Sequence, residues 1–440
     1  MSADQESTRK RVTSDQLTHE KIDHLVRDAV FGADDFKGRS RQQILEWAIQ
    51  KGIFPASIQS FYEARGKKLY SDLTVPAINI RGITYDVARA VFKAAMQYRV
   101  GAFVFELARS EIGYTGQRPG EYAACVLAAG IREGFRGPVF LQGDHFQFSH
   151  SRYRSDPKGE MESIKGLVRE AADAMFLNID IDASTLVDTE KPGLYQQQED
   201  NCRVMAEMTK FIRSIEPKAL TISVGGEIGE VGKRNSTVKE LRAFMSGYLS
   251  QLGPGIRGIS KISVQTGTTH GGVVLADGSV AQVEIDFQAL KDLSTTARDE
   301  YGMAGAVQHG ASTLPDEAFD MFAKVGCAEI HLATGFQNII YDSPYFPQQL
   351  RDRIYQHLRD KYSGERSTGD TDEQFIYKTR KKAFGDFKKE LWDLPEDSLN
   401  KIGETLQERF ALLFKKLNVV NSADLVNRYV VNQYLPKKAV

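Results

Sequence analysis

Hydrophobic and polar positions alternate along the middle of the chain in a regular order. Short apolar runs rich in β-branched and aromatic residues are followed by longer segments in which apolar positions recur at helical spacing. We expect strands at 73–80, 102–108, 138–143, 174–181, 219–225, 258–266, 304–308 and 327–333. Helical patterns lie between them, and a further helix is expected over about 346–361. Eight strand–helix units predict an α/β protein whose parallel strands close into a (β/α)8 TIM barrel.

An open, doubly wound sheet is the alternative for such an alternation. No expected strand is followed by G-x-G-x-x-G, so the barrel is favoured. Two connections are longer than the others, 184–200 after the fourth strand and 271–285 after the sixth. In the second, Asp277-Gly278 between β-branched runs predicts a hairpin. Both lie on the side where barrel enzymes build their sites.

The two ends of the chain differ from this pattern. We expect a helical N-terminal extension over 1–70, the catalytic barrel over 71–361 and a helical C-terminal extension over 362–440. In the last part, 377–394 and 397–417 have the spacing of amphipathic helices. The basic run within the first of these, 378–389, could bind an anion or a partner, but a solvated helix face balanced by nearby acids is the favoured interpretation.

Composition narrows the class of partner. The formal net charge is −1, so we expect no nucleic acid or anionic membrane as partner. The N-terminus lacks the apolar stretch of a signal peptide, and no segment has the length of a membrane helix. Three cysteines without a C-x-x-C pair indicate a reduced, cytoplasmic protein without a thiolate metal site. Helical additions at both ends favour a homo-oligomer.

Titratable side chains gather where the expected strands end. The carboxyl ends of barrel strands form the catalytic face, so these residues should meet there. Four of the eight histidines lie at these ends, His145, His270, His309 and His331. Carboxylates lie at other ends, and neutral imidazoles with a carboxylate suit zinc or another divalent cation.

Glycines accompany two of these histidines. The sequences "HGG" at 270–272 and "HGAST" at 309–313 place backbone N–H groups in tight turns before helices. Such turns favour a phosphate or another anion. Ser312, Thr313 and Thr334 add hydroxyl donors.

Taken in order, these motifs resemble those of one family. "PAIN" at 76–79, "GDH" at 143–145, "GEIG" at 226–229, "THGG" at 269–272, "HGAST" and a final "HLAT" at 331–334 are similar to the class II, metal-dependent fructose-bisphosphate aldolases over about 73–345. The resemblance implies a divalent metal, zinc or a similar ion. It implies metal-site residues at His145, His270, His309, Glu227 and Asp182. It implies catalytic roles for Asp144, which would transfer the substrate's hydroxyl proton, and for Glu227 and Asn79. It implies substrate or phosphate contacts at Gly271, Gly310, Ser312, Thr334, His331 and Arg109.

The sequence also departs from the family pattern. Gln142 stands where the family has the first histidine of H-x-D-H, and Gly225 where it has a glutamate. The strand-eight motif N-x-D-T-D is replaced by 331–335, and the proton-transfer glutamate of the mobile loop has Glu230 as a possible substitute. "FELARSEIGYTGQRP" and "LNIDIDAS" are instead similar to tagatose-bisphosphate aldolase subunits and to ketose or hexuronate epimerases.

These features predict zinc-dependent aldol cleavage or condensation of a sugar phosphate, a ketose, through an enediolate that the metal stabilises. Three alternatives remain open. The same metal could serve a ketose or uronate epimerase. Lys261 could form a Schiff base, although a lysine on a strand end or on the outer face of the barrel is the favoured interpretation. The chain could also be a non-catalytic aldolase subunit.

Overall fold

Eight parallel strands close into a barrel in the computed structural model, which describes residues 18–229, 234–267, 275 and 284–432. The barrel strands are β2 (Val75–Asn79), β3 (Val104–Ala108), β4 (Gly137–Gln147), β5 (Asn178–Asp182), β6 (Ser223–Glu227), β7 (Lys261–Val264), β8 (Ala306–Gln308) and β9 (Glu329–Leu332). Each strand pairs with the next along the chain, and β2 pairs with β9 to complete the ring. The expected (β/α)8 barrel is confirmed.

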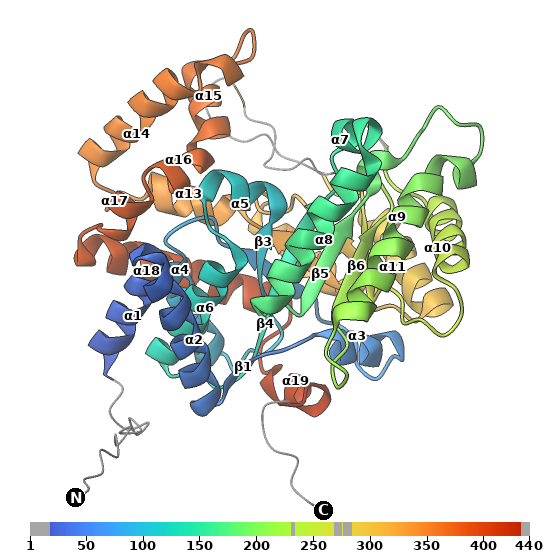
Figure 1. Ribbon diagram of the computed structural model, residues 1–440, viewed down its shortest axis with the longest axis horizontal. Coiled ribbons are helices and arrows are strands. Elements are labelled where there is room, and N and C mark those ends of the chain that lie inside the picture. Colours follow the sequence, from blue (N-terminus) through green and yellow to red (C-terminus); the bar gives the residue numbers. More distant parts are fainter. Residues whose placement is uncertain (1–17, 230–233, 268–274, 276–283, 433–440) are drawn as a thin grey trace, which may run out of the picture.

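Helices follow the strands and surround the barrel (Figure 1). They are α4 (Thr84–Gln97), α5 (Arg109–Thr115), α6 (Pro119–Glu133), α7 (His150–Ser155), α8 (Pro157–Asp173), α9 (Leu194–Ile215), α10 (Val238–Leu252), α11 (Phe287–Tyr301), α12 (Phe319–Lys324) and α13 (Thr334–Asp342). Short 3-10 turns precede α9 and α12, at Ser184–Leu186 and Asp316–Ala318. The amphipathic spacing that predicted these helices places their apolar faces against the strands.

Two strands begin later than expected, because the first apolar residues of their runs lie outside the hydrogen-bonded strand. β6 begins at Ser223 although the apolar run begins at 219, and β5 begins at Asn178 although its run begins at 174. The buried residues before these strands belong to the connections from the preceding helices. β4 differs in the other direction, because it continues to Gln147 beyond the expected end at 143.

The N-terminal extension forms α1 (His19–Phe31), α2 (Asp34–Gln50), the short strand β1 (Ile53–Pro55) and α3 (Gln59–Gly66). α1 and α2 pack against each other and against α6. The sequence pattern did not indicate β1, which pairs in parallel with the first residues of β4. Three residues are too few for a period-2 pattern to be visible.

The barrel region ends with α14 (Gln348–Lys361). The C-terminal extension then consists of η4 (Ser363–Glu365), α15 (Asp372–Thr379), η5 (Arg380–Lys382), α16 (Ala383–Asp386), α17 (Lys388–Trp392), α18 (Glu396–Lys416) and α19 (Ala423–Tyr429). α14 to α17 lie at one end of the molecule, and α18 packs along α4 (Figure 1). The single amphipathic helix expected over 377–394 is thus broken into several short pieces. The interpretation of its basic run as a solvated face is wrong for Arg380, which is 5% exposed.

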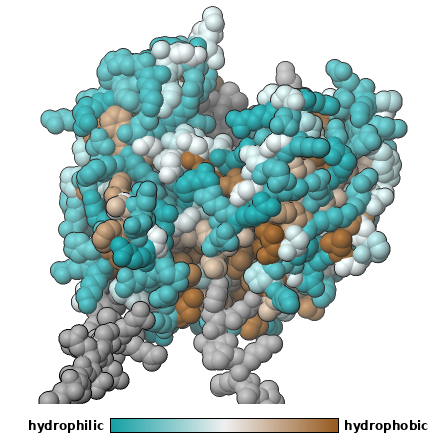
Figure 2. Space-filling model, in the orientation of Figure 1, coloured by the Kyte–Doolittle hydropathy of each residue, from teal (hydrophilic) through white to brown (hydrophobic). Residues whose placement is uncertain are grey.

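A continuous core joins the barrel strands, the surrounding helices and both extensions. Cys125, Cys202 and Cys327 are buried in it without disulfides. Hydrophilic side chains predominate on the face in Figure 2, and hydrophobic ones lie mainly in its lower half. Among the described residues, no helix combines the length and apolar character that a membrane crossing needs.

Candidate active site

The carboxyl ends of the barrel strands open into a cavity of about 800 Å³. Its walls come from β2, β3, β4 and β9 and from the loops that follow β4, β5 and β8. Lys381 of η5, in the C-terminal extension, completes one side. Of the predicted site residues that the structure describes, this wall contains Asn79, Arg109, Asp144, His145, His309, Gly310, Ser312, His331 and Thr334.

A bulge in β4 allows two adjacent residues to face this cavity. The pairing of β4 with β5 shifts in register between Gly143 and Phe146. His145 takes the left-handed conformation in this bulge, with φ 41°. Gly143 is needed for space, because a Cβ there would lie 2.5 Å from the Phe146 ring. The bulge explains how Asp144 and His145 both reach the site although neighbours in a regular strand point to opposite faces.

We call the residues around His145 the mouth cluster: Asp144, His145, Asp182, Glu227 and His309. His145 Nδ1 lies 3.0 Å from an Asp182 oxygen and 3.3 Å from a Glu227 oxygen. Its Nε2 lies 2.9 Å from His309 Nδ1. The side chains come from β4, β5, β6 and the loop after β8, so the fold gathers them from four separate parts of the sequence.

The mouth cluster fits a divalent cation. One ligand atom from each of His145, Glu227 and His309 lies within 4.8 Å of the others. Two imidazoles and a carboxylate are a donor set typical of zinc and similar ions. Asp182 also contacts His145, and a carboxylate in that position orients a metal-binding imidazole.

Negative charge predominates in this cluster. Burial and, after it, the neighbouring Asp182 raise the pKa of Glu227 to about 7 against the lowering influence of His145. For Asp144, burial would raise the pKa, but the positive charges of His145 and His331 outweigh it and lower the pKa to about 2. Burial also works against a charge on His145, whose pKa is nevertheless raised well above its usual value by Asp144 and Glu227. The carboxylates thus require a positive charge beside them, from protons or from a metal.

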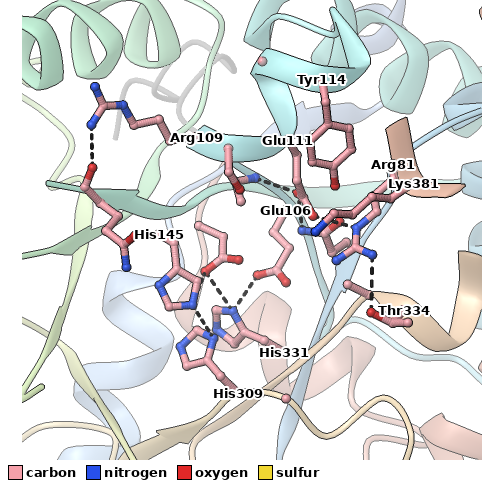
Figure 3. A pocket seen from close by; sticks show the side chains of 18 of the residues that line it. Arg81, Glu106, Arg109, Glu111, Tyr114, His145, His309, His331, Thr334 and Lys381 are labelled. Atoms are coloured by element: carbon pink, nitrogen blue, oxygen red, sulfur yellow. Dashed lines mark hydrogen bonds and ion pairs between the residues drawn. The ribbon is translucent and has the colours of Figure 1, made fainter. Parts of the chain in front are cut away.

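Below the mouth lies a second group, the interior cluster: Gln142, Asp180, Lys261, Glu329 and His331. Lys261 Nζ lies 2.8 Å from both Asp180 and Gln142 and pairs with Glu329. His331 Nε2 lies 2.6 Å from Glu329, and its Nδ1 lies 3.1 Å from Asp144. His331 therefore links the two clusters, and Figure 3 shows its ring beside those of His145 and His309.

Lys261 points into the barrel and is 1% exposed, which corrects the expectation of a strand end or an outer face. Burial disfavours the charge, but Asp180 and Glu329 outweigh it and raise the pKa of Lys261 above its usual value. A Schiff base requires an uncharged amine that the substrate can reach. The enclosed, paired ammonium of Lys261 is unsuited to that chemistry.

The departures from the family motifs meet at Lys261. Gln142 accepts a hydrogen bond from its ammonium. A Cβ at Gly225 would lie 2.2 Å from Asp180 and 2.9 Å from the Lys261 side chain, so glycine makes room for this ion pair. His331 binds the same Glu329 as Lys261 does. Three substitutions that are far apart in the sequence therefore belong to one buried network.

The remaining predicted residues occupy the rim. Gly310 takes a φ of 72°, and Ser312 Oγ accepts a hydrogen bond of 2.9 Å from the backbone N–H of Ala333. Asn79 donates to Glu111 at 2.6 Å. Arg109 lies across the cavity from Lys381 and pairs with Glu160 at 2.6 Å (Figure 3).

Some predictions lie outside the described residues. They are the metal ligand His270, the phosphate contact Gly271, the hairpin at Asp277-Gly278 and the loop acid Glu230. The roles assigned to the other site residues stay predictions. Their positions are those reported above.

Several residues of the site had no role predicted for them, although two of these, Glu106 and Arg81, were expected at the strand ends that form the catalytic face. Glu106 lies at the His331 imidazole, 2.9 Å from its Nδ1, and burial together with Asp144 raises the pKa of Glu106 to about 8. An acid within the apolar run "FVFELA" was the signal for it. Arg81 follows β2, and Lys381 comes from a part of the chain whose sequence gives no indication of the barrel mouth.

The fold and this site define a (β/α)8 barrel with a polar, histidine-rich mouth that fits a divalent cation. The family model of class II fructose-bisphosphate aldolases matches residues 67–391. The chain belongs to that family. A comparison with curated proteins found no match.

Several solved structures share the fold. A fructuronate-tagaturonate epimerase from Cohnella laeviribosi has a TM-score of 0.59 at 12% identity, covering 86% of this chain and 85% of that one. A protein from Sinorhizobium meliloti 1021 described as a probable tagatose 6 phosphate kinase has a TM-score of 0.55 at 16% identity, with coverage of 81% and 98%. A fructose-bisphosphate aldolase from Campylobacter jejuni has a TM-score of 0.50 at 17% identity, with coverage of 84% and 96%. At these identities the likeness establishes the fold and not the reaction.

Proposed function

We propose that this protein catalyses metal-dependent aldol cleavage and condensation of a ketose phosphate. The observation that carries the proposal is the β4 bulge, which presents Asp144 to the cavity and His145 to the cation-binding donor set at the same place. An acid–base group beside a metal site is the combination that C–C cleavage next to a carbonyl needs. Membership of the aldolase family supports the same class of reaction.

His145, His309 and Glu227 would hold the cation, and Asp182 would keep the His145 ring in place. A divalent cation there would act as a Lewis acid on the carbonyl and hydroxyl oxygens of the ketose. The excess of carboxylates in the mouth cluster supports a cationic occupant, because buried anions without a positive partner are costly.

Asp144 would accept the proton of the substrate hydroxyl as the adjacent C–C bond breaks. An aspartate beside a positive charge, whether a proton on His145 or a cation in the same place, is a carboxylate at neutral pH, which a proton acceptor requires. The aldehyde fragment would then leave, and the electron pair of the broken bond would stay on the ketone fragment. In the condensation direction the same carboxyl group would return the proton.

Epimerisation of a ketose or a uronate is the second candidate. The specific observation in its favour is that His331 and Glu106 lie beside Asp144, at the end of the cavity where the family's usual strand-eight motif is missing. Inversion of a carbinol centre requires an acid–base group that can act on a second face, and these residues add such groups. The epimerase among the structural neighbours has the same fold.

The test combines metal analysis with product identification. The purified protein, with and without added zinc, is incubated with fructose 1,6-bisphosphate, with tagatose 1,6-bisphosphate and with fructuronate, and products are followed by NMR. We expect triose phosphates from a bisphosphate and loss of activity with a chelator; epimers alone would establish the second candidate. Turnover that continues without any bound divalent ion would contradict both.

A matched pair of histidine variants localises the metal. His309→Ala should lower metal affinity more than about 100-fold, because even residues that only support a ligand contribute 10- to 100-fold. His357→Ala, in α14 and outside the cavity, should leave metal content unchanged. The expectations of a homo-oligomer and of a cytoplasmic location stay predictions.

A further inference from the structure

Lys381 is a cation at the cavity that the proposed chemistry does not use. It lies in η5, outside the barrel sequence, yet it lines the same cavity as His145 and His309. Figure 3 shows it beside Arg81, with Tyr114 and Thr334 as neighbours, on the side of the cavity away from Arg109.

Neighbouring contacts fix the position of Lys381. Arg380 donates to Asp342 at 2.6 Å and to Asn338 at 2.7 Å, whereas Lys382 pairs with Glu365. The two flanking residues are therefore held on other partners, and Lys381 is left facing the cavity.

Two glycines allow the extension to approach this closely. A Cβ at Gly385 of α16 would lie 2.0 Å from the Tyr114 carbonyl oxygen, and a Cβ at Gly82 would lie 2.0 Å from the Phe384 ring. The segment that carries Lys381 is thus packed directly onto α5 and onto the end of β2. Its place at the mouth follows from tight packing.

The charge of Lys381 is not neutralised as those of its neighbours are. Within the described part of the chain, no carboxylate lies within salt-bridge distance of its ammonium, which instead lies 5.8 Å from the centre of the Tyr114 ring. Arg81 is bound to Glu111 at 2.8 Å and donates to Thr334 at 3.3 Å, and Arg109 is bound to Glu160. Arg152 also lines the cavity but is exposed to water.

A partly buried ammonium without a counter-charge is stabilised by an anion. Burial and the positive charge of Arg81 both lower the pKa of Lys381. Glu111 and Glu365 act in the opposite direction but lie farther away than a salt bridge allows. A substrate oxyanion at this point would remove the unfavourable repulsion between the two cations.

We propose that Lys381 is a specificity-determining residue that binds the anionic terminal group of the substrate, a phosphate ester or a carboxylate. Ser312 and Thr334 also line the cavity, and their hydroxyls would complete the subsite. The proposal rests on the proposed function, because it concerns the substrate of the same site. It places the charged end of the sugar on the side of the C-terminal extension and leaves the Arg109 side for uncharged hydroxyls.

Binding of small anions tests the proposal without turnover. Glycerol 3-phosphate and glycerate are titrated calorimetrically at pH 7 into the full-length protein and into Lys381→Met, Lys381→Arg and Lys382→Met. Losing a charge-assisted hydrogen bond should weaken binding of the preferred probe about 10- to 100-fold in Lys381→Met. Lys381→Arg should restore most of the affinity, and Lys382→Met should bind within about two-fold of the wild type. The probe that the wild type binds more tightly identifies the anion.

Either of two results would overturn the proposal: wild-type affinity in Lys381→Met, or equal weakening in Lys382→Met. Absence of binding of both probes to the wild type would do the same. The outcome is independent of the reaction catalysed. Lys381-dependent binding in a protein that neither cleaves nor epimerises sugars would leave this proposal standing and refute the proposed function. Conversely, sugar cleavage or epimerisation by a protein whose anion binding does not depend on Lys381 would refute this proposal and leave the proposed function standing.

Discussion

The mouth cluster and the interior cluster are both buried groups of titratable side chains, but they differ in charge balance. In the interior, the ammonium of Lys261 pairs with both Asp180 and Glu329, so each carboxylate has a cationic partner. In the mouth, carboxylates surround imidazoles that carry a positive charge only when protonated. A balanced cluster stabilises one structure, whereas an unbalanced cluster requires a ligand. The difference in charge balance favours a structural role for the interior cluster and agrees with the chemical role that we propose for the mouth cluster.

The largest expected effect comes from the mouth. Asp144→Asn keeps the shape of the side chain but removes the proton acceptor, so turnover should fall by about 10² to 10⁴-fold. The free energy of unfolding should fall by about 1 to 2 kcal/mol, because the amide can still accept the hydrogen bond from His331 while the negative charge beside that imidazole is lost. Turnover assays and urea denaturation measure the two quantities. Asp352→Asn on the exposed side of α14 is the control, and retained turnover in Asp144→Asn would remove Asp144 from the mechanism.

The interior should respond in the opposite way. Lys261→Met leaves Asp180 and Glu329 without their shared cation and should lower the free energy of unfolding by about 3 to 5 kcal/mol. Lys165 offers a matched control, because it also bridges two carboxylates, Glu162 and Glu207, but at the surface. Lys165→Met should cost less than about 1 kcal/mol in urea denaturation. Equal costs for the two variants would show that the interior network is not what distinguishes the clusters.

The smallest expected effect on stability concerns Glu106, which contacts His331, the residue that links the two clusters. This effect depends on pH. Glu106 faces Asp144, His331 and Glu329, and its pKa is raised to about 8 by burial and by Asp144. Between the ordinary pKa of a glutamate and pH 8, the folded protein keeps a proton that the unfolded chain releases, so wild-type stability falls as pH rises. In metal-free protein the free energy of unfolding of the wild type, relative to that of Glu106→Gln, should therefore decrease steadily as the pH rises through that window.

Urea denaturation at pH 5.5, 7 and 8.5 measures this difference. Glu162→Gln, at an exposed position of α8, should follow the wild type at all three values. A constant difference between Glu106→Gln and the wild type across the range would mean that Glu106 ionises normally in the folded state.

The barrel could be predicted because hydrophobic patterning is local. All eight strands lie where the apolar runs indicated them, although β5 and β6 begin about four residues later than their runs. Most of the candidate site followed as well, since the carboxyl ends of barrel strands share one face. The sequence showed Gln142 and Gly225 as departures from the family pattern, but it did not show that both belong to the buried network around Lys261.

Contacts between distant parts of the chain could not be predicted. The interior network joins β4, β5, β7 and β9, and Tyr62 of α3 reaches it with a hydrogen bond to Glu329. Local patterning does not say which inward side chains meet across a barrel. The same limit explains why Lys261 was expected at a strand end or on the outer face and why the basic run was interpreted as a solvated helix.

The sequence by itself determined the class of fold, the edge at which the site lies and most of the residues that form the mouth, because strand periodicity and short motifs are local properties. Only the tertiary structure decided that His145 carries the strained turn of β4, that the departures from the family pattern converge on Lys261, and that Lys381 faces the cavity. Each of these depends on packing between segments far apart in the chain, where a single Cβ or one buried charge selects the arrangement.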